Sequence, residues 1–313
     1  MTAIDSNVFL VFGGNEGSKL SSSLYKLSLN PTRWETVETT GSKPCARAFH
    51  AVLFDIEENK MFCFGGLGAR QSLDDCFELD IAHLLWEPIF AEVGHRPPAP
   101  RHGHTFTQVS KSGAAVLFGG AGAGFFNDVF LFDIKTGKWD QPLVTGSLPE
   151  ARAFHTACPL INGSKVFIFG GTNGSRTFAD LHVLDISPGS DRLVWSTVDV
   201  RGPAPCGRWG HSAMPNGMDS MVVFGGGGDA FCDDLLQFNA FKSSWSEFRG
   251  PGDAPCGRWG HACWLAEDTQ TLLVLGGCGR LGTGRGRKCQ GDAYVCYLDY
   301  LQRGQAVRSF VQR

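Results

Sequence analysis

Short apolar runs that end in a pair of glycines recur along the whole chain. The pairs stand 52, 54, 51, 55 and 51 residues apart, at Gly13-Gly14, Gly65-Gly66, Gly119-Gly120, Gly170-Gly171, Gly225-Gly226 and Gly276-Gly277. Two glycines at the end of a strand permit backbone angles that are closed to other residues, and they let neighbouring chains approach closely. A period of about fifty residues predicts six copies of one supersecondary unit.

Within each copy the apolar and polar positions form four short, strand-like segments. In the third copy these cover residues 104–109, 114–118, 128–132 and 139–144, separated by stretches rich in Gly, Asn and Asp. Such spacing predicts antiparallel strands joined by turns. An Asp opens the third segment in five copies, where we expect its side chain to bond local backbone and fix the turn. These residues are Asp75, Asp128, Asp180, Asp234 and Asp292.

Two further markers keep the same order and phase as the glycines. A Trp follows the pair in five copies, where it would pack between adjacent sheets, at Trp34, Trp86, Trp139, Trp195 and Trp245. An Arg-x-x-His segment recurs as Arg47/His50, Arg101/His104, Arg152/His155, Arg208/His211 and Arg258/His261. Because an active site does not recur once per repeat, we interpret these pairs as structural residues that bond the turn entering each inner strand.

Phe-Gly-Gly, the Asp-led aromatic strand, the Trp and Arg-x-x-His together resemble the kelch repeat over nearly the whole chain. The resemblance implies an all-β fold, a six-bladed kelch-type β-propeller with four antiparallel strands per blade. It also implies a single domain that covers residues 1–313. These motifs are specific for the fold and say much less about function.

The two ends of the repeat depart from the pattern. The first predicted strand, at 7–12, matches the second strand of a blade, so we expect the first blade to lack its innermost strand. The sixth copy has a long loop at 278–290 and no Trp. Residues 306–311 would form the outer strand of the sixth blade or, because Arg308-Ser309-Phe310 echoes Arg47-Ala48-Phe49, the missing strand of the first. The former arrangement leaves an unpaired edge, which a partner would cover or which would mark the chain as a fragment.

The composition limits the classes of function. With 28 Lys and Arg against 31 Asp and Glu, the net charge of −3 argues against a nucleic-acid partner. No apolar run reaches the roughly 18 residues that span a bilayer, and the N-terminal residues lack a secretory pattern, so we expect no membrane association. The 11 Cys are then expected as reduced thiols in a cytoplasmic protein, with the nucleus as the alternative.

Three cysteines share one repeat position, two residues before the Arg: Cys45, Cys206 and Cys256. Only the last two lie in adjacent copies, and no two cysteines have Cys-x-x-Cys spacing. A zinc site needs its thiolates to converge on one ion. We therefore expect no metal and no cofactor.

Partner binding is expected where the copies differ, because the shared residues build the fold. The kelch resemblance implies that the residue after the repeat Arg faces the loop side, here Ala48, His102, Ala153, Trp209 and Trp259. The two Trp lie in neighbouring copies. They would form an aromatic wall suited to binding, or they would tuck under adjacent loops.

The loops after the glycine pairs add apolar and basic groups to this side. The candidate partner-binding residues are Trp209, Trp259, His102, Phe125, Phe126, Phe231, Arg70, Arg176, Arg280, Arg285, Arg287 and Lys288. Because Arg side chains bind carboxylates through paired hydrogen bonds, the expected partner is a protein or peptide that is acidic or carries a carboxylate. The alternative for 278–290 is a solvated loop without a partner.

The leading hypothesis is a protein-interaction module or scaffold that binds a partner on the loop face, as an adaptor or a ubiquitin-ligase substrate-recognition domain. The alternative is an enzyme or a metal-dependent enzyme modifier, since some propellers of this family are copper oxidases or iron-dependent specifier proteins. The chain lacks the Glu-x-x-x-Asp-x-x-x-His run of the specifier proteins, and it has only 4 Tyr for a Tyr-Cys copper centre. RNA or phosphate binding by the Arg-rich loop is a third hypothesis.

Overall fold

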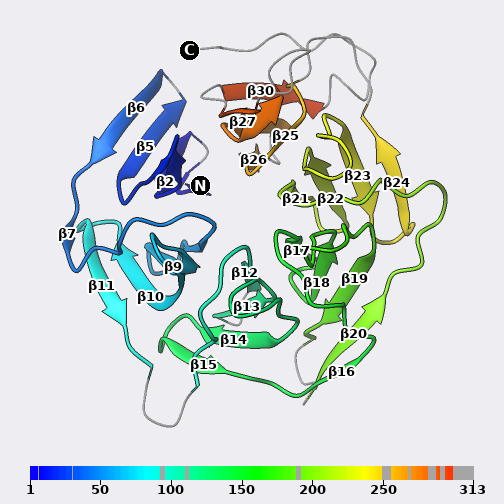
Figure 1. Ribbon diagram of the computed structural model, residues 1–313, viewed down its shortest axis with the longest axis horizontal. Helices are drawn as coiled ribbons and strands as arrows, with labels where there is room; N and C mark the ends of the chain where they lie inside the picture. The colour runs from blue at the N-terminus through cyan, green and yellow to red at the C-terminus, as the bar shows by residue number, and fades with distance from the viewer. Residues whose placement is uncertain are drawn as a thin grey trace. The chain divides into compact units, whose positions relative to one another are not determined.

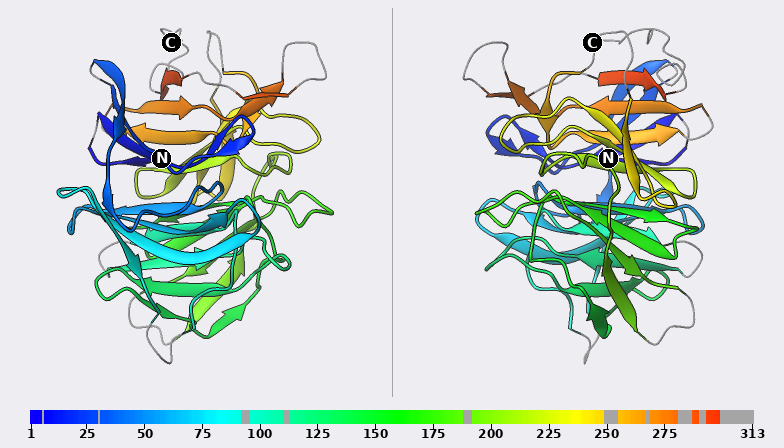
Figure 2. Two further views of the ribbon diagram at one scale, coloured as in Figure 1. Left: turned by 60° about the vertical axis from the view of Figure 1, so that its left-hand side comes forward. Right: turned by 90° about the vertical axis from the view of Figure 1, so that its right-hand side faces the viewer.

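The computed structural model describes residues 1–5, 7–29, 31–91, 96–109, 113–187, 192–248, 255–266, 269–280, 287–289 and 293–298. Its elements are β-strands, and each copy of the repeat forms an antiparallel sheet whose main strands follow one another in chain order (Figure 1). Neighbouring strands of a sheet are twisted relative to one another (Figure 2). Nothing in the described part of the chain is a helix long and apolar enough to cross a bilayer.

The first two copies form two sheets. The first sheet has the order β1 (Thr2–Ala3), β2 (Val8–Phe12), β5 (Leu24–Leu29) and β6 (Thr32–Val37), and a hairpin of β3 (Asn15–Glu16) and β4 (Lys19–Leu20) follows its glycine pair. The second has the order β7 (Thr40–Gly41), β11 (Leu85–Ile89), β10 (Ser72–Asp80), β9 (Lys60–Leu67) and β8 (Ala51–Asp55). Because β7 pairs with β11 in parallel, the segment that leaves one sheet adds a fifth strand to the next.

The third and fourth copies follow the same plan. The third sheet contains β12 (Thr105–Val109), β13 (Ala114–Phe118), β14 (Val129–Asp133) and β15 (Lys138–Asp140). The fourth has the order β16 (Val144–Gly146), β20 (Leu193–Thr197), β19 (Leu181–Asp185), β18 (Lys165–Phe169) and β17 (Thr156–Leu160). The prediction of one strand over 139–144 was wrong: β15 ends at Asp140, and Val144 begins a strand that joins the next copy.

The fifth sheet contains β21 (Ser212–Asn216), β22 (Ser220–Phe224), β23 (Leu235–Asn239) and β24 (Ser244–Glu247), and the sixth contains β26 (Ala262–Ala266), β27 (Thr271–Leu275) and β30 (Ala293–Tyr297). A small separate sheet joins β25 (Arg258–Trp259), β28 (Cys278–Arg280) and β29 (Arg287–Cys289). The segment predicted as a long loop at 278–290 therefore contains two paired strands. Residues 306–311, on which both predictions for ring closure rest, lie outside the described residues.

Contacts group the chain into two compact units, Met1–Val144 with Pro149–Ala153 and Thr145–Leu148 with Phe154–Arg313. The first three sheets belong to the first unit and the last three to the second, apart from Val144 at the start of β16. A single domain over residues 1–313 stays a prediction.

The first sheet has an innermost strand, contrary to the expectation that this strand is missing. Thr2 and Ala3 form β1, which pairs antiparallel with β2 at Leu10 and Phe9. The sequence gives little sign of this strand because it is two residues long and carries no Arg-x-x-His segment. The edge of β2 is thus partly covered.

The repeat markers meet between successive sheets. In the first unit, the Phe64 ring lies 4.9 Å from Trp139 and 5.4 Å from His104, both of the following copy. In the second unit, Phe169 lies 4.9 Å from Trp245 and 5.2 Å from His211. Phe-Gly-Gly of one copy therefore packs against the Trp and the His of the next. The Phe64 and Trp139 contact lies in one buried cluster shared by the second and third sheets.

Trp34 departs from the predicted packing role. Trp86 and Trp139 are buried, whereas Trp34 in β6 is 50% exposed. The buried Trp residues contact a Phe of the copy that precedes them, as Trp86 does with Phe12 at 5.1 Å.

The first glycine of a pair is required by a close approach between sheets. Gly65 has φ +60, and a Cβ at this position would lie 2.8 Å from the carbonyl oxygen of Arg101 and 3.1 Å from Cε1 of His104. The next residue, Gly66, donates its N–H to the same Arg101 oxygen at 2.8 Å. A side chain here would separate two sheets that hydrogen-bond directly.

Candidate functional site

The repeat Arg is a buried structural residue. Arg101 is 0% exposed, and its Nη1 and Nη2 donate to Asp128 Oδ1 and Oδ2 at 2.6 and 2.9 Å. Nη1 also donates to the Gly119 oxygen at 3.0 Å, and Nε donates to the Ala99 oxygen at 2.9 Å. The planar guanidinium has five N–H donors, so it can bond both oxygens of a carboxylate and nearby carbonyl oxygens at the same time.

The same fork recurs in other copies. Arg47 pairs with Asp75, and Arg208 pairs with Asp234. The prediction that these Asp side chains serve local backbone therefore missed their main partner, since a buried guanidinium needs a counter-charge. Burial alone would lower the pKa of Arg47, but its hydrogen bonds with Asp75 and the Coulombic attraction to Asp75 and nearby cysteine sulfurs together outweigh that effect and raise the pKa. The remaining repeat Arg residues are equally buried, Arg152 and Arg258.

The repeat His residues are buried or partly buried, and three of them, His50, His211 and His261, are uncharged near neutral pH. Four of them are buried, namely His104, His155, His211 and His261, and His50 is partly buried. Burial lowers the pKa of His50 and of His261 to about 3, and it lowers the pKa of His211 well below its ordinary value. Neutral rings of this kind can pack among apolar side chains without a counter-charge.

The hydrogen bonds of these rings add a role to the one predicted for them. Nε2 of His211 lies 2.7 Å from Thr156 Oγ1 of the preceding copy, and Nε2 of His261 lies 2.9 Å from Ser212 Oγ. These two rings therefore link successive sheets, a role that the predicted bond to each residue's own turn did not include. For His155, which directly precedes Thr156 and is 5% exposed, a bond to the turn stays a prediction.

The residues after the repeat Arg fall into two groups. Ala48 and Ala153 are buried, whereas His102, Trp209 and Trp259 are partly exposed. Ala48 forms the same antiparallel backbone bridge as His102 and Trp209, so the difference lies in how far each side chain is covered. That all five residues face the loop side stays a prediction. A methyl group is small enough to be covered by the loops around it, whereas an indole reaches past them.

The two Trp candidates meet in the second unit. Their ring centroids lie 4.8 Å apart at an interplanar angle of 56°, a tilted contact between partly exposed rings. The Trp209 backbone is held by paired hydrogen bonds with Gly227, each 2.8 Å long. Gly260 donates its N–H to the Gly210 oxygen at 2.8 Å, so the backbone beside both rings is also joined.

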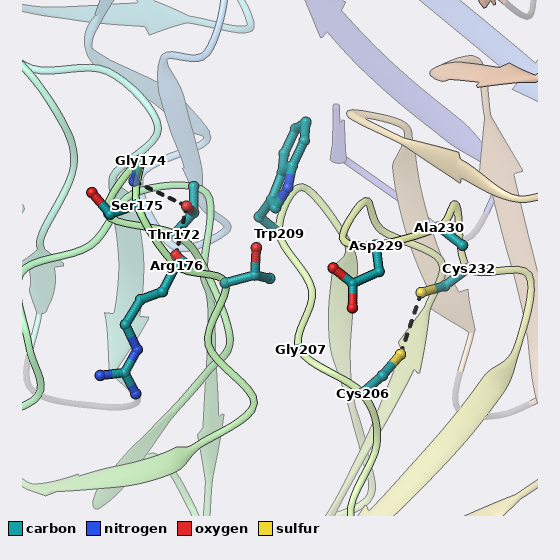
Figure 3. Close-up of a pocket in the computed structure, with 11 residues that line it drawn as sticks. Thr172, Gly174, Ser175, Arg176, Cys206, Gly207, Trp209, Asp229, Ala230 and Cys232 are labelled. Carbon is teal, nitrogen blue, oxygen red and sulfur yellow. Dashed lines mark hydrogen bonds between the residues drawn. The ribbon is translucent and has the colours of Figure 1, made fainter. Parts of the chain in front are cut away.

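Trp209 lines a pocket of about 760 Å³ in the second unit (Figure 3). Three segments form its wall: the loop after the fourth glycine pair, the segment that enters the fifth sheet, and the loop after the fifth glycine pair. The lining residues are Thr172, Gly174, Ser175, Arg176, Thr177, Cys206, Gly207, Trp209, Asp229, Ala230 and Cys232. The volume falls in the range of small-molecule and peptide side-chain sites.

Local hydrogen bonds shape the first of these loops. The Asn173 side-chain oxygen accepts the N–H groups of Ser175 and Arg176 at 3.1 and 2.9 Å, and Thr172 Oγ1 donates to the Arg176 oxygen at 2.8 Å. Such a turn fixes the backbone with the residue's own side chains. The exposed Arg176 guanidinium lies 4.9 Å from the centre of the Phe178 ring.

The pocket carries charges of both signs. Figure 3 shows Arg176 on the wall from the fourth copy and Asp229 on the wall from the fifth. Arg176 and Trp209 were predicted from the sequence as partner-binding residues, and Asp229 was not. Its position three residues after the Gly225-Gly226 pair was the available signal, because the loops after the glycines were expected to face the binding side.

Other candidates lie in the first unit. His102 Nδ1 lies 2.9 Å from Ser72 Oγ, and burial lowers the pKa of this His. The Phe126 ring lies 4.3 Å from the Arg101 guanidinium carbon, so it packs on a structural residue, while Phe125 is 37% exposed. Arg70 is exposed.

A hairpin of β28 and β29, which carries the basic candidates Arg280, Arg287 and Lys288, pairs through β28 with the strand that contains Trp259. Trp259 pairs with Cys278, and in the same small sheet Arg280 pairs with Arg287 and Gly279 with Lys288. Phe231, which is partly buried, has its carbonyl oxygen 2.5 Å from where a Cβ on Gly257 would lie. Arg285 lies outside the described residues. Within the described ranges, no three His, Cys, Asp or Glu side chains are grouped as a metal site would need.

Comparison with known proteins places this geometry in a family. The profile of the KLHDC2/KLHL20/DRC7 Kelch-repeats domain matches residues 1–226, 90–277 and 188–302. The chain belongs to the kelch-repeat family. The sequence prediction of this family is therefore confirmed.

The chain is also similar to curated kelch proteins. It is 32% identical over 212 residues to the mouse (Mus musculus) Rab9 effector protein with kelch motifs, covering 64% of this chain and 53% of that protein. It is 30% identical over 254 residues to human (Homo sapiens) Host cell factor 1, covering 74% of this chain and 12% of that protein. The chain thus spans about half the length of the Rab9 effector.

A solved structure, "Structure of YjhT", matches with a TM-score of 0.66 at 17% identity, over 94% of this chain and 97% of that one. At this identity the match concerns the fold alone. With the six repeated sheets and the kelch profile, it confirms the predicted all-β, six-bladed propeller class.

Proposed function

We propose that this kelch protein is a non-catalytic interaction module that binds a partner protein or peptide at the pocket beside Trp209. The observation that carries the proposal is the contact between Trp209 and Trp259, two partly exposed indoles 4.8 Å apart, one of which lines the pocket. Trp is the residue most enriched at binding hot spots. Kelch relatives support a protein partner, as the name of the Rab9 effector indicates for that protein.

The pocket also suggests which part of a partner it would hold. An apolar side chain would lie against the Trp209 ring, and a carboxylate would be drawn to the exposed Arg176 guanidinium. Asp229 on the opposite wall would repel an acidic segment and attract a basic one. The sequence favours an acidic or carboxylate-bearing partner. We propose such a partner as the more specific form of the binding function.

We extend the proposal to an adaptor role in the cytoplasm, with the nucleus as the alternative location. A ubiquitin-ligase substrate-recognition role is a special case of the same binding activity. It would show as ligase subunits in the complexes captured with the partner.

The proposal is tested by affinity capture from cell extract with the wild type and a Trp209→Ala, Trp259→Ala double variant. The expected result is a partner retained by the wild type and lost by the double variant. Trp34→Ala is the matched control, because Trp34 is also exposed but does not line the pocket. Equal thermal unfolding of all three proteins shows that the fold is intact. A partner retained by the double variant would contradict the proposed site.

A photo-crosslinking residue at position 175 places the partner directly. Ser175 is exposed and lines the pocket, whereas Met218 is 54% exposed and does not. We expect crosslinks from position 175 and none from 218. For an acidic partner, Arg176→Gln weakens binding and Asp229→Asn strengthens it. If Arg176→Gln instead strengthened binding and Asp229→Asn weakened it, the pocket would still be the binding site, but the partner would not be acidic.

A further inference from the structure

Two cysteine sulfurs meet in the wall of the pocket. Cys206 Sγ and Cys232 Sγ lie 3.7 Å apart, as the dashed line in Figure 3 marks. Cys206 is exposed and Cys232 is partly buried, and neither forms a disulfide in this structure. They lie 26 residues apart in the chain, so the contact is made by the fold.

The repeat explains why this contact occurs in the fifth copy. Two repeat positions lie near each buried Arg. The first is two residues before the Arg, and the copies have there Cys45, Ala99, Glu150, Cys206 and Cys256. The second lies two residues before the repeat Asp and is occupied by Leu73, Phe126, Phe178, Cys232 and Gln290. Only the fifth copy has Cys at both positions.

Backbone hydrogen bonds show that the second position is equivalent between copies. Phe126, Phe178 and Cys232 each donate their N–H to the second glycine of their own pair, at 2.9 Å in every case. In the third copy the Phe126 ring fills this position and packs on the guanidinium of Arg101. A thiol in place of a ring is smaller, and in the fifth copy it leaves room for the Cys206 sulfur.

The local geometry is suited to covalent joining of the two sulfurs. A disulfide has an S–S distance of about 2.05 Å, so the thiols must approach by roughly 1.7 Å from their present contact. Both residues lie outside the strands, between β20 and β21 and between β22 and β23. Side-chain rotation and a small loop shift can supply such a movement, because neither residue takes part in a strand ladder.

The two thiols differ in their surroundings. Cys206 is open to solvent, and Nη2 of Arg208 donates to its sulfur at 3.4 Å. Burial raises the pKa of Cys232 to about 12, so this residue stays a thiol near neutral pH. Cys206 is therefore placed to react first with a soluble oxidant.

We propose that Cys206 and Cys232 are a redox-sensitive pair that a hydroperoxide converts to an intramolecular disulfide and a dithiol reductant restores. The Cys206 thiolate attacks a peroxide oxygen, the O–O bond breaks, and Cys206 becomes a sulfenic acid as water or an alcohol leaves. The Cys232 sulfur then attacks the Cys206 sulfur, and the S–O bond breaks. The oxygen leaves as water with the Cys232 proton. Two thiols lose two hydrogens in all, and the peroxide is reduced by two electrons.

The bond would connect two walls of the pocket. Cys206 lies three residues before Trp209, and Cys232 lies three residues after Asp229. Oxidation therefore fixes the aromatic wall to the acidic wall. Because the reaction needs no partner, its test is independent of the proposed binding function.

The experiment treats the reduced full chain with a limiting amount of hydrogen peroxide and maps peptides without reduction. We expect one linkage, between Cys206 and Cys232, with the loss of two titratable thiols and their return after dithiothreitol. The linkage is absent from Cys206→Ser and Cys232→Ser. It persists in Cys45→Ser and Cys256→Ser, which replace the cysteines of other copies at the repeat position that Cys206 occupies. Sulfinic acid at Cys206 without a linkage, or linkages that join other cysteines, would overturn the proposal.

A second measurement needs no oxidation. Phenylarsine oxide binds two thiols that lie close together, so the reduced wild type should bind it at one site, which both single variants lose. Circular dichroism checks that the variants fold. If a variant fails to fold, peptide mapping of the wild type alone still decides between the expected linkage and its absence.

Discussion

Removing the carboxylate of Asp128 is the sharpest test of the structural role assigned to the repeat Arg. In Asp128→Ala, Arg101 stays 0% exposed and keeps its bonds to the Gly119 and Ala99 oxygens, but it loses both bonds to the carboxylate. Removing one partner of a buried ion pair costs about 3–5 kcal/mol. Asp128 itself is 27% exposed, so solvent screens part of this interaction. We expect a loss of roughly 2–3 kcal/mol in the free energy of unfolding.

The assay is urea unfolding followed by Trp fluorescence and by circular dichroism, with the slope m compared between variants. Asp140→Ala is the matched control, an exposed Asp on the neighbouring strand β15, and its effect should stay within about 0.5 kcal/mol. The double variant Arg101→Met, Asp128→Leu removes both charges and should be more stable than Asp128→Ala. If Asp128→Ala unfolds like the control, the buried charge needs no carboxylate and the assigned role is wrong.

Three more predictions concern stability. Because burial lowers the pKa of His261 to about 3, unfolding favours proton uptake between that value and the unfolded pKa near 6.5, so stability falls as the pH drops through this window. The slope approaches about 1.4 kcal/mol per pH unit below the unfolded pKa. The loss between pH 7 and 5.5 should therefore be roughly 1.2 kcal/mol for His261, measured as urea midpoints, and a flat profile would contradict it. Gly65→Ala should cost clearly more than Gly17→Ala in the same assay. Both have positive φ, but only Gly65 faces a backbone oxygen at 2.8 Å, and equal losses would argue against the close approach. If Cys206 and Cys232 are oxidised, closing their loop should stabilise the protein by roughly 3 kcal/mol, seen as a higher Tm that dithiothreitol reverses. An unchanged Tm would mean that strain in the folded state offsets the loop closure.

The repeat could be predicted from sequence because its markers are large or conformationally special residues at fixed spacing. Phe64 comes from one copy and Trp139 and His104 from the next, yet periodicity alone indicated that each has a recurring role. The pairing of Arg101 with Asp128 was not predicted, although both positions recur. Their 27-residue separation does not show which side chains meet, because that depends on how a loop folds back over its own sheet.

The pocket was less predictable for the same reason. Trp209 and Trp259 stood out as the largest residues at a position that holds Ala in two other copies and His in a third. Asp229 carries no motif, and Cys232 gained meaning only when the structure placed it opposite Cys206. The two-residue strand at Thr2–Ala3 was missed because so short a segment has no periodicity.

Arg101 joins two sheets through different parts of one residue. Its side chain bonds within its own sheet, at Asp128 and Gly119, while its backbone N–H and C=O bond to Leu73 and Gly66 of the preceding sheet. In a repeat protein, the stability of one unit and its coupling to the next are usually treated as separate quantities. Here they depend on the same residue, so selection cannot loosen one copy without also weakening its link to a neighbour. Such a fold tolerates substitutions in its loops far better than at the repeat Arg, which two copies share.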